Sequence, residues 1–272
     1  MKCVSFNTNS LRIRLHQIQA VIDKHAPMFI GIQETKVNDP DFPIEEIKKL
    51  GYHVEFHGQK THYGVALMSK LPFDACQKGF ITDTSESQKR FIQGEFTLEN
   101  GEKMTVMNGY FPQGESREHP TKFPNKKQFY SDLQDHLVKN YTAEQNIIVM
   151  GDMNISHADA DIGIGEPNRK RWLRDGKCSF LPEEREWLDT LLHWGLVDTY
   201  RQVNTNITDE LYSWFDYRSK GFEREPKRGL RIDLVLASTS LATKTVASGI
   251  DYDVRALEKP SDHCPIWTEF NI

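Results

Sequence analysis

Short runs of aliphatic, β-branched and aromatic residues recur along the chain, with polar or glycine-containing segments between them. Runs of this length and composition are typical of β-strands. The pattern predicts at least nine strands, over residues 2–7, 29–33, 53–57, 64–69, 91–98, 103–111, 146–151, 232–238 and 264–270.

Other segments carry apolar residues at helical spacing and predict about four helices. In the first, Leu11, Leu15, Ile18 and Ile22 fall on one face, and Asn9 or Ser10 is placed to cap its start. The remaining three are residues 44–50 closed by Gly51, a segment opened by Pro124, and a segment that begins at Pro182 and ends near Gly195.

The order of these elements predicts an α/β fold with two stacked sheets and helices outside them. Between residues 64 and 111 the pattern runs from strand to strand without a helix. That order is not expected of the alternative, a single parallel sheet wound by helices on both faces.

Composition indicates a globular protein. The chain has 272 residues, 38% of them hydrophobic, and no apolar stretch as long as a membrane helix. Its first ten residues read as a strand and not as a signal peptide, and its four cysteines are scattered without a paired spacing. We therefore expect a cytoplasmic protein with no membrane association. A formal net charge of −5 neither indicates nor excludes a nucleic-acid partner.

Polar residues gather where the predicted strands begin or end. They are Asn7, Glu34, Tyr110, Asp152, Asn154, Asp233, Asp262 and His263. Strand ends are rigid and meet at one edge of a sheet, so these side chains can converge there without burying charge in the core. Asp233 is the most informative, because a carboxylate within an apolar strand is costly unless it is paired or bound to a metal. Taken singly, Glu34 or Asp152 would more often be an ordinary turn or cap residue than a functional one.

Carboxylate and amide oxygens suit a hard divalent cation, Mg²⁺ or Mn²⁺, better than zinc. No pattern typical of a nucleophilic serine or cysteine appears. Such a metal site suits phosphate ester hydrolysis, in which the ion neutralises phosphate oxygens while a carboxylate orients or deprotonates water.

Five motifs carry a resemblance to a known family. They are Q-E-T-K at 33–36, N-G-Y-F-P-Q-G at 108–114, M-G-D-M-N-I at 150–155, L-R-I-D-L at 230–234 and S-D-H-C-P at 261–265. In order and spacing they resemble the exonuclease III family of DNA repair nucleases. One departure is Ser10, where the family usually has a glycine, which adopts backbone angles that serine disfavours.

The resemblance implies a four-layered, DNase I-like α/β sandwich, with residues 1–272 forming one catalytic domain that acts as a monomer. It implies a metal-dependent phosphodiesterase of double-stranded DNA that removes nucleotides from 3′ ends, clears blocked 3′ termini and cuts on the 5′ side of abasic sites. Inositol-phosphate and sphingomyelin phosphodiesterases share this sandwich and are the rival enzymes. A catalytically inactive DNA-binding module is the rival of a different class.

The resemblance also assigns roles to the strand-end residues. Glu34 would be the principal metal ligand, assisted by Asn7 and Asp262. Asp152 would orient or deprotonate water with support from Asn154. If the reaction uses two metal ions, Asp152 and Asn154 would hold the second ion. Tyr110 and His263 would contact the cleaved phosphate, with Asp233 fixing the imidazole.

Two basic segments are expected to hold DNA. Residues 166–177 carry a net charge of +3 and residues 217–231 a net charge of +4, and both read as loops. Within the first, Arg169, Lys170 and Arg171 are candidate phosphate contacts; the alternative is a solvated basic surface. By resemblance, Arg12 and Gln113 would also contact phosphates, and Trp214, Leu230 and Ile232 would line an apolar pocket for a flipped abasic sugar. Trp214 could instead be an ordinary core residue.

Overall fold

The structure is a computed structural model and describes residues 1–205 and 211–272. Two six-stranded mixed sheets form its centre. The first has the order β11 (Thr245–Ile250), β12 (Ile266–Phe270), β1 (Lys2–Asn7), β2 (Phe29–Gln33), β4 (Val65–Ser69) and β3 (His53–His57). The second has the order β5 (Ala75–Lys78), β6 (Phe91–Thr97), β7 (Lys103–Tyr110), β8 (Asn146–Asp152), β10 (Asp233–Ser238) and β9 (Leu196–Asp198).

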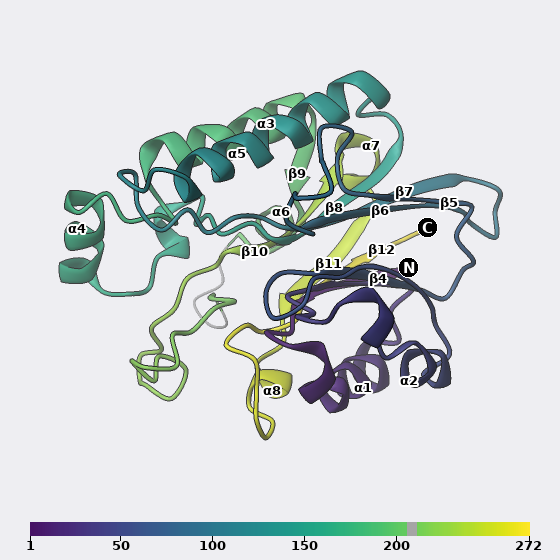
Figure 1. The fold of residues 1–272 in the computed structure, drawn as a ribbon, viewed down its shortest axis with the longest axis horizontal. Coiled ribbons are helices and arrows are strands. Elements are labelled where there is room, and N and C mark those ends of the chain that lie inside the picture. The colour runs from purple at the N-terminus through teal and green to yellow at the C-terminus, as the bar shows by residue number, and fades with distance from the viewer. Residues whose placement is uncertain (206–210) are drawn as a thin grey trace.

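The sheets pack face to face, and helices cover their outer faces (Figure 1). The helices α1 (Leu15–His25) and α2 (Ile44–Lys49) lie on the first sheet, and α3 (Lys122–Asn140) and α5 (Pro182–Trp194) lie on the second. The predicted four-layered sandwich is thereby confirmed. The other α-helices of the described residues are α4 (Glu166–Arg174), α6 (Thr199–Val203), α7 (Thr239–Ala242) and α8 (Tyr252–Arg255). Within residues 1–205 and 211–272, no helix has both the length and the apolar character needed to cross a bilayer.

Three apolar clusters correspond to the three interfaces between layers. Phe29, Leu67 and Ile148 belong to the cluster between the sheets. A second cluster joins α1 and α2 to the first sheet, and a third joins α3 and α5 to the second. Because both sheets are covered on both faces, their central strands are buried along nearly their whole length.

All nine predicted strands are present, and three further strands were missed. β5, β9 and β11 escaped prediction because they are short or half exposed and lack a clear apolar run. The first helix begins at Leu15 after a 3₁₀ turn over Leu11–Ile13, and neither Asn9 nor Ser10 caps it with a side chain. Ser10 instead has a φ of 98°, within the backbone region that favours glycine.

The prediction that residues 166–177 form a loop was wrong, because residues 166–174 form α4. Glu166 pairs with Lys170 four residues later, and Pro167 occupies the first turn, where a missing N–H costs nothing. Trp172 and Leu173 pack against the small cluster formed by Phe180, Leu230 and Ile232. Two adjacent apolar residues do not produce a helical period, so the sequence pattern did not reveal this helix.

Candidate active site

Strand pairing brings five polar side chains to one edge of the sandwich. β1 ends at Asn7 and runs parallel to β2, which ends one residue before Glu34. In the second sheet β7 ends at Tyr110, which lies opposite Asp152 at the end of β8. β10 begins at Asp233, which lies opposite Asp152 from the other side. Each sheet therefore contributes part of the site.

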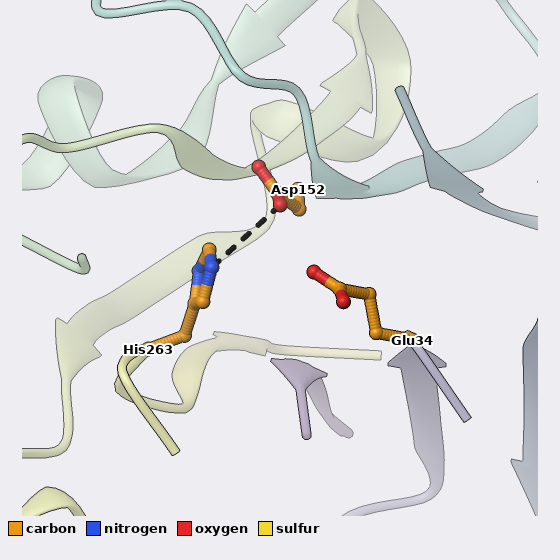
Figure 2. Close-up of side chains that lie close together, drawn as sticks. All are labelled: Glu34, Asp152 and His263. Atoms are coloured by element: carbon orange, nitrogen blue, oxygen red, sulfur yellow. Dashed lines mark ion pairs between the residues drawn. The ribbon is translucent and has the colours of Figure 1, made fainter. Parts of the chain in front are cut away.

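Glu34, Asp152 and His263 converge at the centre of this edge (Figure 2). One ligand atom from each lies within 4.8 Å of the others. His263 Nε2 lies 3.7 Å from Asp152 Oδ2. Asp152 and His263 are buried, whereas Glu34 is partly exposed, so solvent reaches the cluster at Glu34.

Asn7 and Lys36 hold the two carboxylates in place. The Asn7 side-chain amide donates to Glu34 Oε1 and to Asp152 Oδ2, both at 3.0 Å. Lys36 Nζ lies 2.9 Å from Glu34 Oε2 and also donates to the side chain of Asn9. Lys36 belongs to the Q-E-T-K motif but was not predicted as a site residue, because a lysine next to a loop is usually an ordinary surface residue.

His263 and Asp233 form a buried pair. His263 Nδ1 lies 2.9 and 3.1 Å from the two carboxylate oxygens of Asp233. Burial alone would lower the pKa of His263, but the Asp233 and Asp152 carboxylates outweigh it and raise that pKa to about 10. The ring is therefore a cation at neutral pH, and its Nε2–H is directed toward the cluster.

Asp152 has the electrostatics of a base that works near neutral pH. Burial raises its pKa from 3.8 to about 7; His263 lowers it, while Asp233 and Glu34 raise it further. The backbone N–H of Asn154 donates to Asp152 Oδ1 at 3.0 Å, which fixes the carboxylate. A carboxylate with a pKa near 7 can accept a proton from water far better than an ordinary aspartate.

Arg90 packs against Tyr110 and holds it in position. The Arg90 guanidinium lies over the Tyr110 ring at 4.5 Å and over the Tyr63 ring at 4.1 Å, and it donates to the Tyr110 carbonyl at 3.0 Å. Burial raises the pKa of Tyr110 well above 10, and the Glu34 carboxylate adds to that effect, although Arg90 opposes it. The phenol thus stays protonated and can donate a hydrogen bond to a phosphate oxygen.

The cluster fits a hard divalent cation. Glu34 and Asp152 offer carboxylate oxygens beside a ring nitrogen of His263. The pKa of Asp152 is raised first by burial, and the neighbouring carboxylates of Asp233 and Glu34 raise it further. A divalent ion would offset both effects, because an opposite charge within a few ångströms favours the ionised carboxylates.

Asp262 lines the same cavity but stands beside the cluster. Its Oδ1 accepts a hydrogen bond from the Asn9 amide at 2.9 Å, and its Oδ2 accepts one from Trp214 Nε1 at 3.0 Å. Both oxygens are thus engaged within the protein. The proposed assistance of Asp262 in metal binding stays a prediction.

Next to the cluster is an apolar wall. Trp214, Leu230 and Ile232 line the cavity that also contains Glu34 and His263, and its volume is about 160 Å³. Leu230 and Ile232 are almost fully buried, whereas Trp214 is partly exposed and pairs by backbone with Leu230. Trp214 is therefore a wall of the cavity and not an interior core residue.

The predicted phosphate contacts differ in their surroundings. Arg169 pairs with Asp159 at 2.7 Å and Lys170 with Glu166 at 3.5 Å, so both have partners within the protein. Arg171 and Arg12 are exposed. Gln113 is also exposed and lines the catalytic cavity.

Arg231 does not belong to the basic surface in which its sequence position placed it. It is 1% exposed and forms hydrogen-bonded ion pairs with Asp161 and Asp198. Residues 217–231 thus present one cation fewer than their sequence suggests.

A buried ion pair behind the catalytic loops was also missed. Lys126 Nζ donates to Glu184 Oε1 at 2.5 Å, to the Asn154 carbonyl at 2.8 Å and to the Gln113 carbonyl at 3.3 Å. Both side chains are fully buried. Lys126 and Glu184 lie 58 residues apart on two amphipathic helices, so no local pattern could pair them.

Comparisons with known proteins identify the family and support the fold. Residues 4–263 match the model of the endonuclease/exonuclease/phosphatase family. The chain is 56% identical over 270 residues to exodeoxyribonuclease III of Haemophilus influenzae, a match that covers 99% of this chain and 100% of that protein. It superposes with a TM-score of 0.88 on the structure of a 3′ phosphatase, NExo, from Neisseria bound to a product DNA hairpin, at 33% identity and with 100% coverage of both chains. An AP endonuclease from Archaeoglobus fulgidus also gives a TM-score of 0.88, at 31% identity and with 100% coverage of both chains.

Proposed function

The chain belongs to the endonuclease/exonuclease/phosphatase family and is a DNA repair nuclease, and from this premise we propose that it hydrolyses phosphodiester bonds of double-stranded DNA with Mg²⁺ or Mn²⁺. It removes nucleotides from 3′ ends, clears blocked 3′ termini and cuts on the 5′ side of abasic sites. It works as a monomeric, cytoplasmic enzyme, and residues 1–272 form its one catalytic domain.

The observation that carries this proposal is the position of the Glu34–Asp152–His263 cluster beside an apolar wall. The cluster suits a metal ion and a phosphate, and the wall of Trp214, Leu230 and Ile232 suits the uncharged face of a sugar without a base. A phosphodiester that joins such a sugar to its neighbour fits both parts of one cavity. The exposed cations of α4 and of the 217–231 segment favour a polyanionic substrate over a lipid headgroup.

In this reaction the residues of the site hold the metal, activate water or contact the phosphate. Glu34 is the main metal ligand, with Asn7 and Asp262 assisting, and a bound divalent ion supplies charge to neutralise the phosphate oxygens. Asp152 accepts a proton from the attacking water and is positioned by Asn154, and these two residues hold a second ion if two act. The His263 cation, oriented by Asp233, and the Tyr110 phenol donate to phosphate oxygens as negative charge accumulates there.

The DNA is held around this centre. Arg12, Gln113 and Arg171 contact phosphates, with Arg169 and Lys170 contributing when their internal partners release them. Trp214, Leu230 and Ile232 receive the flipped abasic sugar, which explains how one cavity serves both 3′ ends and abasic sites.

The test uses purified protein with a 3′-recessed duplex and with a duplex that contains one abasic site. Each is incubated with Mg²⁺, with Mn²⁺ or with EDTA, and products are resolved by length. We expect shortening of the recessed 3′ strand and a single cut 5′ of the abasic site, both abolished by EDTA. Binding of the duplexes without cleavage in either metal would instead support an inactive DNA-binding module. In a parallel assay with sphingomyelin and an inositol phosphate, hydrolysis of either without cleavage of DNA would support the rival enzymes.

A further inference from the structure

A second cavity lies beside the catalytic one, and Trp172 and Trp214 line both. Its volume is about 230 Å³. Figure 1 shows that α4 and the segment after residue 210, which together form its walls, lie at the same end of the molecule. We name this space the arginine cavity, because Arg171, Arg224 and Arg228 line it.

Among the residues that the structure describes, the three exposed arginines have no acidic partner. In the part of the chain that the structure describes, none of their guanidinium groups forms an ion pair; Arg171 donates to Asn168 Oδ1 at 2.9 Å and Arg224 to the Ser219 carbonyl at 2.8 Å. Within residues 1–205 and 211–272, Asp216 is the one acid that lines the cavity, so three cations there face one carboxylate. Arg169 on the same helix is already paired with Asp159, which sets the arginine cavity apart from the rest of the basic surface.

Clustered, unpaired guanidinium groups in a cavity favour a phosphate. Arginine presents its N–H groups as a planar fork that matches two phosphate oxygens, and it loses less hydration than lysine when it binds. Asn168 and Ser219 add neutral polar groups to the same walls.

The direction of the DNA strand connects the two cavities. A cut on the 5′ side of an abasic nucleotide leaves its sugar on the 3′ side of the cleaved phosphate. With that phosphate at Glu34 and His263, the sugar lies against Trp214, a residue that also lines the arginine cavity. The next charged group along the strand is the phosphodiester that follows the sugar.

We propose that the arginine cavity binds this phosphodiester, the one on the 3′ side of the abasic sugar. The inference rests on the proposed function and adds a determinant of substrate preference. A 3′-terminal nucleotide has no phosphate in that position, so the arginine cavity favours cleavage at internal abasic sites over removal of terminal nucleotides.

The test pairs a change in the protein with a change in the DNA. One duplex carries an internal tetrahydrofuran abasic analogue, and a second carries the same analogue followed by a neutral methylphosphonate at the proposed linkage. The wild-type protein should lose roughly tenfold in kcat/KM on the second duplex, as expected for a lost charge-assisted contact. The variant Arg171→Gln/Arg224→Gln should lose a similar factor on the first duplex and almost nothing further on the second, because the two changes remove one interaction.

Two controls make the result specific. Arg174→Gln, on the same helix but paired with Asp175 and outside the cavity, should keep the wild-type ratio between the two duplexes. A methylphosphonate several linkages away should affect wild type and double variant equally. Melting temperatures of the variants verify that they are folded.

Two outcomes would overturn the proposal. In the first, the loss of kcat/KM from the arginine changes and the loss from the methylphosphonate simply multiply. In the second, neither change lowers kcat/KM. A wild-type protein that fails to cut the unmodified abasic duplex would contradict the proposed function instead. The two failures are therefore distinguishable.

Discussion

At the scale of single residues, the backbone holds two active-site groups in an unusual conformation. Glu34 has a φ of 51° and Asn154 a φ of 53°, both in the left-handed region. Asparagine tolerates that region, but glutamate occupies it only where neighbours enforce it. Here the N–H of Thr35 donates to the Gly64 carbonyl at 3.1 Å and that of Lys36 to the Tyr63 carbonyl at 3.0 Å. Local strain is thus maintained next to the carboxylate on which metal binding is proposed to depend.

Replacing that carboxylate should separate metal binding from folding. Glu34→Gln keeps the size of the side chain and removes its charge, so the affinity for Mg²⁺ should fall by tenfold or more while the fold survives. Isothermal titration of the protein with MgCl₂ measures the affinity, and the melting curve verifies the fold. Glu45→Gln, an exposed change on α2, serves as the control. A Glu34→Gln protein that binds Mg²⁺ like wild type would remove Glu34 from the ligand set.

The His263–Asp233 pair predicts non-additive losses of turnover. His263→Asn removes the cation proposed to face the phosphate and should lower kcat by roughly 10²–10⁴. Asp233→Asn releases the imidazole and should also lower kcat, while the double variant should be clearly less impaired than the product of the two losses. Single-turnover rates on an abasic duplex measure all four proteins. Losses that simply multiply would show that the two residues act independently.

Much of the catalytic cluster could be predicted at this scale, because its residues lie at or near the ends of apolar runs. A role for Asp233 could be predicted, because its charge interrupts an apolar run and a buried carboxylate needs a partner. The engagement of Asp262 by Asn9 and Trp214 was not, because those partners lie 253 and 48 residues away. Contacts between residues that are distant in the sequence cannot be inferred from a local sequence pattern.

At the scale of elements, α3 and α5 fix the catalytic loops through a buried ion pair. Lys126 on α3 binds the carbonyls of Gln113 and Asn154, while Glu184 on α5 accepts the N–H groups of Ser179 and Leu181 at 2.8 Å. The two helices thus do more than cover the second sheet. They also set the position of the loops that carry Gln113 and Asn154.

Removing one member of this ion pair should destabilise the fold. Lys126→Met leaves the Glu184 carboxylate buried without its cation and should lower the free energy of unfolding by about 3–5 kcal/mol. Adding Glu184→Gln should recover part of the loss, because the uncompensated charge disappears. Urea unfolding measures both proteins. Lys139→Met, an exposed change on the same helix, should stay within about 0.5 kcal/mol of wild type. Equal effects of the buried and exposed changes would contradict the argument.

At the scale of the whole molecule, the active site exists only because the two sheets pack together. The first sheet supplies Asn7 and Glu34, and the second supplies Tyr110, Asp152 and Asp233. The strands themselves were predictable from apolar runs. Their order was not, because β12 pairs with β1 through residues more than 250 positions apart, as in Lys2 opposite Glu269. Pairing between distant segments is decided by packing across the whole fold.

Charged groups also connect the N-terminal helix α1 to the C-terminal part of the chain. Asp251 caps α8, and its carboxylate accepts hydrogen bonds from His25 at 2.7 Å and from Lys24 at 2.9 Å, both on α1. Burial alone would raise the pKa of Asp251, but the hydrogen bonds from His25 and Lys24 outweigh it and lower that pKa from 3.8 to about 2. A carboxyl group with a lower pKa in the folded state stabilises the fold above its unfolded pKa, and the stabilisation is lost as pH falls toward the folded pKa.

Stability between pH 5 and pH 2 should therefore report on this junction. At neutral pH, Asp251→Asn should lower the free energy of unfolding by about 2 kcal/mol. The difference from wild type should shrink as pH falls below about 4 and nearly vanish near pH 2, where wild-type Asp251 also becomes protonated. Urea unfolding at a series of pH values measures the two curves. Asp253→Asn, which removes an exposed carboxylate that also meets Lys24, should change stability by less than about 1 kcal/mol. Parallel curves for wild type and Asp251→Asn across this range would show that the junction owes its stability to packing and not to the ionised carboxylate.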